Sequence, residues 1–189
     1  MSTLLKVTKL ATEAGLAFLV IGGNAVIAHG YQRGTKDLDL LVRDSDTNDW
    51  DVLVRGIGYN EIYRNAGIMM YEHATGELVP LDLVTVADST FERMASTQVV
   101  VTLNAASIQI PRLSHLVAMK LHAIRQNPFE RYERDLGDIV ALMTRNGVSL
   151  ETPEFRATFN RHATAEIRAE VERRLAGPGA AEPWPGRAG

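Results

Sequence analysis

The 189-residue chain contains no cysteine. This absence excludes disulfide bridges, thiolate zinc sites and cysteine nucleophiles together. The chain also lacks any apolar run close to the ~20 residues that a helix needs to cross a bilayer. Its first fifteen residues have the pattern of an amphipathic helix rather than that of a signal peptide. These absences predict a cytoplasmic protein with no membrane partner.

An excess of positive charge is also missing, since the formal net charge is −3. A protein that binds nucleic acid over a broad surface needs such an excess. Any nucleic-acid partner would therefore have to bind a local basic patch. The candidate residues for such a patch are Arg125, Arg131 and Arg134. Hydrophobic content of 46% and charged content of 23% are ordinary for a globular protein. The composition thus predicts a folded chain with a core of its own.

The most informative stretch begins where an apolar run breaks at Gly22 and Gly23, and it ends in Asp37-Leu38-Asp39 at the head of a second apolar run. Side chains alternate faces along an extended strand, so Asp37 and Asp39 point the same way. Carboxylates held this close repel one another unless they share a proton or bind a cation. Magnesium is such a cation, because it takes oxygen ligands from one or two carboxylates and from substrate phosphates.

A third carboxylate, Asp82, lies between two leucines in a predicted strand over 78–86. A charged side chain flanked by apolar residues needs a partner, because its desolvation is costly. If this strand lies beside the strand predicted at 37–42, Asp82 joins the other two aspartates. The paired glycines, with a helix expected from Asn24, leave backbone N–H groups that can point at a phosphate. The sequence therefore predicts three carboxylates next to a phosphate-binding turn.

The periodicity of apolar residues organises the rest of the chain. It predicts an α/β core over 1–110, a helical segment over 111–176 packed on that core, and a disordered Gly-, Pro- and Ala-rich tail over 177–189. In the core, strands are expected at 16–21, 37–42, 78–86 and in a hairpin that turns at 104–106. Behind the core, helices are expected at 113–126, 131–146 and, as one helix or a pair, 152–175.

Gly-Gly, a spacing of thirteen residues, Asp-x-Asp before an apolar strand and one later acidic strand form a specific set. This set resembles the DNA polymerase β-like nucleotidyltransferase superfamily. The fuller GGNAVIAHGYQRGTKDLDLLV, with PRLSHLVAMKLHAIR and ERDLGDIVAL downstream, is similar to bacterial abortive-infection-type toxin nucleotidyltransferases and their uncharacterised relatives. The resemblance implies an α+β fold, in which helices flank a mixed sheet and a helical segment follows. It also implies transfer of a nucleoside monophosphate from an NTP to an acceptor hydroxyl.

Carried over position by position, the resemblance assigns Asp37, Asp39 and Asp82 to two magnesium ions, with manganese as an alternative. Asp82 would also help to deprotonate the attacking hydroxyl. The nucleotide would be bound by a set that begins at the glycine turn, namely Gly22, Gly23, Asn24, Arg33, Thr35, Lys120 and Asp138. For Arg33 the alternative is a solvated loop arginine without a ligand. One position departs from the pattern, because many members have serine where this chain has Gly23.

Three functions fit these features. The first is a nucleotidyltransferase that modifies a tRNA 3′ end or a protein side chain, as the toxin of a pair with an antitoxin partner. The second transfers the nucleotide to a small-molecule antibiotic, since the same signature resembles aminoglycoside and lincosamide nucleotidyltransferases. The third, of another class, is a non-catalytic nucleotide-binding regulator. The presence of all three carboxylates counts against the non-catalytic regulator, because clustered negative charge is unfavourable in a site that no longer binds metal.

Overall fold

The computed structural model describes residues 2–177. Its contacts divide the chain into two compact units, one up to Leu116 and one from Val117 onward. The division falls inside helix α5 (Leu113–Gln126). The tail predicted at 177–189 lies, from position 178 on, outside the described residues. Among residues 2–177, no helix has both the length and the apolar character that a membrane span requires.

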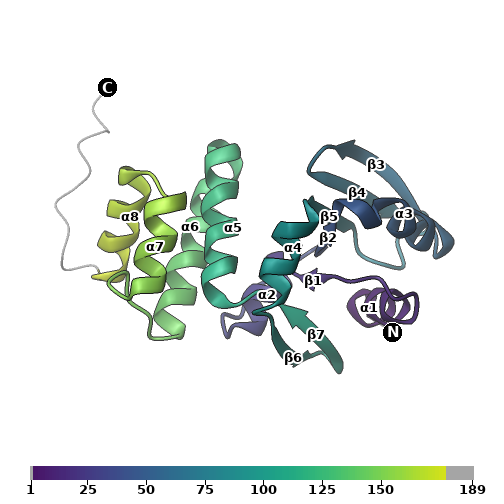
Figure 1. Cartoon of the computed structure of the whole chain (residues 1–189), viewed down its shortest axis with the longest axis horizontal. Coiled ribbons are helices and arrows are strands. Elements are labelled where there is room, and N and C mark those ends of the chain that lie inside the picture. Colours follow the sequence, from purple (N-terminus) through teal and green to yellow (C-terminus); the bar gives the residue numbers. More distant parts are fainter. Residues whose placement is uncertain (1, 178–189) are drawn as a thin grey trace. The chain divides into compact units, whose positions relative to one another are not determined.

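A five-stranded mixed sheet organises the first unit, in the order β1-β2-β5-β4-β3 (Figure 1). β2 runs parallel to β5, and every other neighbouring pair is antiparallel. Parallel neighbours need a long connection, and the chain forms helix α3 (Thr47–Gly56), β3 and β4 between these two strands. The strands are β1 (Leu19–Val20), β2 (Leu38–Arg43), β3 (Tyr59–Asn65), β4 (Ile68–His73) and β5 (Leu81–Val86). The predicted α+β fold with a mixed sheet is confirmed.

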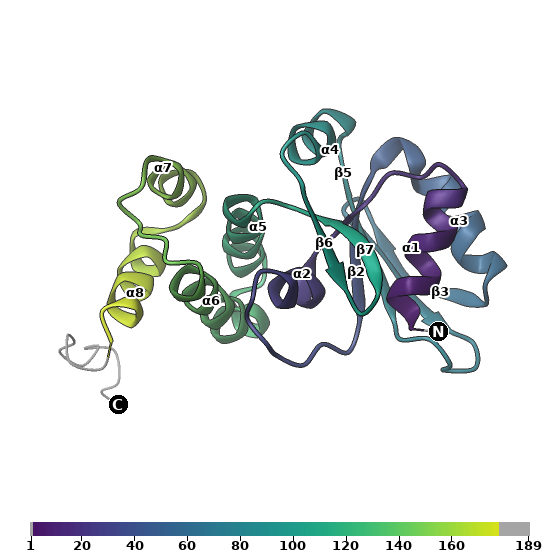
Figure 2. The same ribbon diagram turned by 90° about the horizontal axis from the view of Figure 1, so that it is seen from below.

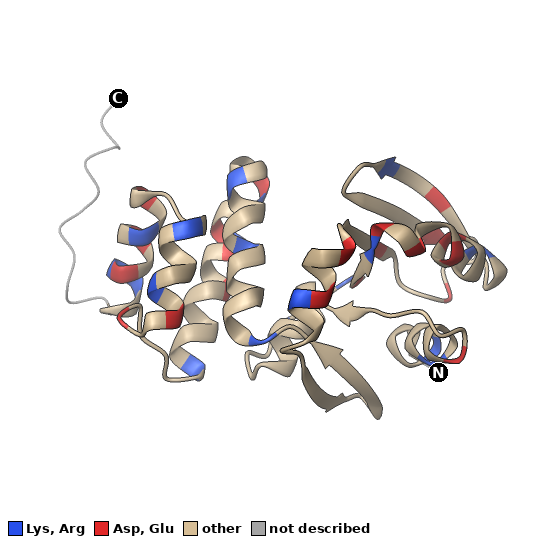
Figure 3. Ribbon diagram, in the orientation of Figure 1, with Lys and Arg blue, Asp and Glu red and all other residues tan. Residues whose placement is uncertain are grey.

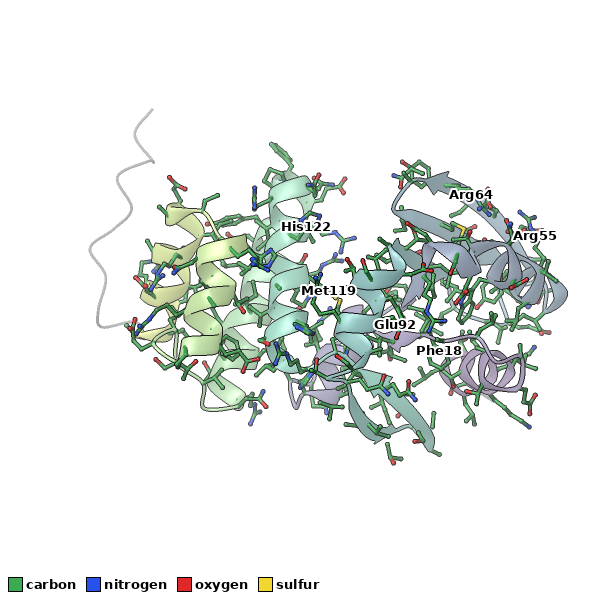
Figure 4. All side chains as sticks on the ribbon, viewed as in Figure 1. Phe18, Arg55, Arg64, Glu92, Met119 and His122 are labelled. Carbon is green, nitrogen blue, oxygen red and sulfur yellow. The ribbon has the colours of Figure 1, made fainter. Side chains whose placement is uncertain are left out.

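Short helices accompany this sheet. They are α1 (Thr3–Glu13), α2 (Gly22–Ala28), the 3-10 turn η1 (Asp44–Asp46), α3 (Thr47–Gly56) and α4 (Asp88–Ala95). α1 and α3 lie beside one another (Figure 2). α1 buries Leu4, Val7 and Ala11, which recur at helical spacing. Phe18, labelled in Figure 4, meets Trp50 of α3 edge to face, with ring centroids 6.0 Å apart. Apolar contacts of this kind form the core of the unit.

A separate hairpin, β6 (Val99–Leu103) and β7 (Ala106–Ile110), forms where the sequence predicts one. Its turn consists of Asn104 and Ala105, whose φ angles are 49° and 65°. Positive φ at both central residues is typical of the two-residue turns that match strand twist. Neither strand carries a charged side chain (Figure 3).

The second unit contains the rest of α5 and three further helices, α6 (Pro128–Arg145), α7 (Pro153–His162) and α8 (Ala165–Leu175). α6 begins at Pro128, because the Asn127 side chain accepts a hydrogen bond from the Glu130 N–H and Pro128 suits a first helical turn. Its buried face includes Leu136, Ile139, Leu142 and Met143. α8 carries both arginines and glutamates (Figure 3).

Several predicted boundaries differ from the structure. β2 begins at Leu38 rather than at position 37, and α6 begins at Pro128 rather than at position 131. The strand predicted at 16–21 is limited to β1, since the Leu16 N–H still bonds to the Ala11 carbonyl at the end of α1. α2 begins at Gly22 rather than at Asn24. The strand predicted from position 78 begins at Leu81, directly after Pro80, which has no N–H to donate to a neighbouring strand. Each difference shifts an element end and leaves the order of elements as predicted.

Candidate metal centre

The three predicted metal ligands converge in the first unit. Asp39 of β2 lies directly opposite Asp82 of β5 in the parallel pair, which confirms that the two strands are neighbours. Asp37 precedes β2 by one residue. One carboxylate oxygen from each aspartate lies within 4.8 Å of those of the other two. Asp82 is buried at 9% exposure, whereas Asp37 and Asp39 are half-buried.

Leucines on both strands fix this arrangement. Asp39 is flanked by Leu38 and Leu40, and Asp82 by Leu81 and Leu83, and all four leucines are at most 1% exposed. A slip of one residue would exchange the leucine and aspartate faces, so burial of the leucines sets the register. The Leu38 N–H also donates to the Pro80 carbonyl at 2.9 Å. The sheet therefore holds the two carboxylates side by side.

Gly22 lies against Asp39. Its φ of +57° is in the left-handed region, which favours glycine. A Cβ added at this position would lie 1.9 Å from Asp39 Oδ2. The residue is therefore glycine for two reasons, one conformational and one steric. Without a side chain at this turn, the backbone approaches the carboxylate closely.

Asp37 is bound by two of the predicted nucleotide-binding residues. Asn24 Nδ2 donates to the Asp37 carbonyl at 3.3 Å, and Thr35 Oγ1 donates to Asp37 Oδ1 at 3.0 Å. Thr35 also lies over Gly23, where an added Cβ would meet its Oγ1 at 2.4 Å and Nη2 of Arg33 at 3.2 Å. The structure thus gathers eight predicted site residues in the first unit, namely Gly22, Gly23, Asn24, Arg33, Thr35, Asp37, Asp39 and Asp82.

The other two predicted residues, Lys120 and Asp138, lie in the second unit. Lys120 Nζ is 2.8 Å from Asp135 Oδ1 and 2.6 Å from Asp138 Oδ2, and all three side chains are buried. Two of the three N–H donors of the lysine are thus engaged within this unit. Contact of Lys120 and Asp138 with a nucleotide stays a prediction. The sequence did not predict the contact of Asp135 with Lys120, although the i,i+3 spacing of Asp135 and Asp138 places both on one helix face.

His29, at the end of α2, has a structural role. Its Nε2 lies 2.9 Å from the Pro111 carbonyl. Burial lowers the pKa of the imidazole, and the hydrogen bond to Pro111 opposes that shift in part. A neutral ring whose Nε2–H donates to a carbonyl fits this position, so we assign the histidine to packing rather than to proton transfer.

The chemistry of the carboxylate group suits a hard divalent cation. All of its donors are oxygens, and magnesium and manganese prefer such ligands. Within residues 2–177, Asp37, Asp39 and Asp82 are the one set of three metal-ligating side chains whose donor atoms converge. Two of them are partly open to solvent, which gives an ion and its substrate a path to the site.

No protein-family model and no curated protein matches the chain. Several solved structures, in contrast, match the chain. The antibiotic-resistance factor ANT(2″)-Ia matches with a TM-score of 0.66 at 14% identity, over 91% of this chain and 95% of that one. The lincosamide antibiotic adenylyltransferase LnuA, with lincomycin bound, has a TM-score of 0.57 at 16% identity, over 76% and 96%. A nucleotidyltransferase-like protein from Paracoccidioides brasiliensis has 0.55 at 14% identity, over 92% and 91%. The chain therefore has the nucleotidyltransferase fold.

Proposed function

We propose that this chain, which has the nucleotidyltransferase fold, is a magnesium-dependent enzyme that transfers NMP from an NTP to an acceptor hydroxyl. The observation that carries the proposal is the convergence of the Asp37, Asp39 and Asp82 carboxylates within 4.8 Å of one another. Their position beside a glycine turn, in a chain with this fold, supports the same conclusion.

The three carboxylates hold the ligand oxygens in place before substrate arrives. Magnesium, when bound, supplies charge that stabilises the entering and leaving oxygens of an in-line displacement. The acceptor oxygen forms a bond to the α-phosphorus, while the bond from that phosphorus to pyrophosphate breaks. Asp82 accepts the proton of the attacking hydroxyl. The remaining catalytic contribution of the chain is placement of the ligands and of the triphosphate.

The glycine turn is the proposed site of the triphosphate. Gly22 and Gly23 have no side chains to block its approach to the backbone. Arg33 reaches this turn and adds a positive charge that suits a phosphate. Asn24 and Thr35 tie the surrounding backbone to Asp37. This arrangement supports the proposed binding of the nucleotide next to the carboxylates.

Two observations favour a small hydroxyl-bearing acceptor. One is the likeness to ANT(2″)-Ia, also solved in complex with adenylyl-2″-tobramycin, and to the lincomycin-bound LnuA, over most of this chain. The other is the net charge of −3, which does not suit a broad nucleic-acid surface. A tRNA or protein acceptor, a toxin role, an antitoxin partner and a cytoplasmic location stay predictions from the sequence.

A transfer assay with α-labelled NTPs tests this function. We expect the protein with Mg²⁺ to label an aminoglycoside or a lincosamide and to release pyrophosphate. Asp39→Asn should slow the reaction about 1,000-fold, which corresponds to about 4 kcal/mol. Asp49→Asn is the matched control, because it removes the same charge from an exposed position on α3.

Three other outcomes have distinct meanings. Label on tRNA or protein would support the chemistry and reverse the choice of acceptor. Full activity in Asp39→Asn would contradict the role of the carboxylates. NTP binding that is equally tight with and without Mg²⁺, in the absence of any turnover, would support a non-catalytic regulator instead.

A further inference from the structure

Arg33, Thr35, Asp37 and Asp39 form an alternating series. These four residues are half-buried, whereas Gly34 and Lys36 between them are exposed. The segment from 31 to 37 has no regular secondary structure, but its burial alternates with a period of two up to Asp37. The hydroxyl of Thr35 lies directly next to the Asp37 carboxylate.

The hydroxyl of Thr35 engages Asp37 twice. Oγ1 lies 3.0 Å from Asp37 Oδ1 and 3.3 Å from the Asp37 carbonyl oxygen. A threonine hydroxyl has one proton to donate, and both acceptors belong to the same aspartate. The hydrogen bond leaves the second carboxylate oxygen of Asp37 available as a metal ligand. Asn24, by contrast, binds only the Asp37 backbone.

Gly23 leaves the space that Thr35 occupies. An added Cβ would lie 2.4 Å from Thr35 Oγ1 and 2.7 Å from Thr35 Cβ. Gly23 is not among the glycines with positive φ, so clearance rather than backbone conformation requires glycine at this position.

We infer that Thr35 is a positioning residue: its hydroxyl holds the Asp37 carboxylate in the orientation for metal binding. Thr35 fits at this position because Gly23 has no side chain. The inference rests on the proposed metal-dependent function. Hydrogen bonds from neighbouring groups commonly orient ligating carboxylates, and loss of such a bond typically costs about 10–100-fold in metal affinity or activity.

Two substitutions separate the hydroxyl from the methyl group. Thr35→Val keeps the shape and removes the hydroxyl, while Thr35→Ser keeps the hydroxyl and removes the methyl. We expect Thr35→Val to weaken Mn²⁺ binding, measured by calorimetry without turnover, and to raise the half-saturating Mg²⁺ concentration for NMP transfer, each about 10–100-fold. Thr35→Ser should stay close to the wild type in both measurements.

The result for Asp39→Asn shows which hypothesis fails. If Asp39→Asn loses metal binding and Thr35→Val keeps it, the role of Thr35 is wrong and the proposed function stands. If Asp39→Asn itself binds Mn²⁺ like the wild type, the proposed function fails first. Equal weakening in Thr35→Val and Thr35→Ser would also overturn the inference, because it would assign the effect to packing. Thermal unfolding of each variant identifies a loss that comes only from misfolding.

Discussion

The first unit, which contains the five-stranded sheet, and the second unit, which is helical, each bring aspartates together, but in different surroundings. We call them the sheet unit and the helical unit. In the helical unit, Asp135 and Asp138 enclose the ammonium group of Lys120, and no member of the group is more than 6% exposed. In the sheet unit, the aspartate carboxylates converge on one another, and two of the three are half-buried. A cation that is part of the chain, such as the lysine ammonium group, can stay buried permanently. An ion that must enter and leave needs access from solvent.

The buried group depends on its lysine. Asp135 Oδ2 is buried and has no hydrogen-bond partner, so Oδ1, which faces Lys120, carries the main compensation for that carboxylate. Removing one partner of a buried ion pair leaves an uncompensated charge, which is far more costly than an altered surface pair. The comparison therefore favours a stabilising role for Lys120 and agrees with the proposed metal binding by Asp37, Asp39 and Asp82.

The largest predicted stability effect is that of Lys120→Met. We expect it to lower the free energy of unfolding by about 3–5 kcal/mol, measured by urea denaturation, because it leaves two carboxylates buried without their cation. Lys9→Met is the control, since Lys9 forms an exposed pair with Glu13 that is worth less than about 1 kcal/mol. Adding Asp135→Asn and Asp138→Asn should recover part of the loss. Wild-type stability together with a raised KM for NTP would instead assign Lys120 to the triphosphate.

A smaller effect is expected for Gly22→Ala. The left-handed backbone costs a non-glycine residue about 1–2 kcal/mol, and the new Cβ must displace Asp39. We expect a loss of about 1–3 kcal/mol in unfolding free energy and a loss of Mn²⁺ binding. Gly34→Ala is the control, because a Cβ there meets nothing within 4 Å. Mn²⁺ binding that survives in Gly22→Ala would mean that the glycine is needed only for the backbone.

The smallest effect concerns a half-buried carboxylate, Glu170, which lies beside two arginines. Arg173, and then Arg174, lower the pKa of Glu170 on α8 from 4.5 to about 2. Because this pKa is lowered, its stabilising contribution is present above about pH 4.5 and is lost as the pH falls toward 2. Glu170→Gln should cost less than about 1 kcal/mol at pH 7. Urea denaturation should show the difference from wild type shrinking below pH 4; a pH-independent difference would contradict this account.

Local signals were sufficient for much of the fold and of the site. The Gly22-Gly23 break, the alternation of Asp37 and Asp39 and the turn at 104–106 depend on forces that act over a few residues, so the sequence predicted them. The β2–β5 pairing is not local. It was predicted because Asp82, placed between leucines, needed a partner.

Contacts that depend on packing between distant residues could not be predicted. Lys120 reaches Asp135 and Asp138 across 15 and 18 residues, from one helix to the next. A single sequence does not fix how the faces of these helices meet. The fit of Thr35 over Gly23 likewise depends on how a loop folds back on α2. In both cases the sequence indicated the residues themselves, whereas only the structure showed which residues they contact.

The most direct test of the metal site is an EPR titration of free Mn²⁺ with the whole chain. It compares the wild type with the double variant Asp37→Asn and Asp39→Asn, each with a non-hydrolysable NTP analogue and against a protein-free blank. We predict that the wild type takes up Mn²⁺ that the double variant leaves free. Equal uptake by the two proteins would contradict the assignment of the carboxylates to a metal.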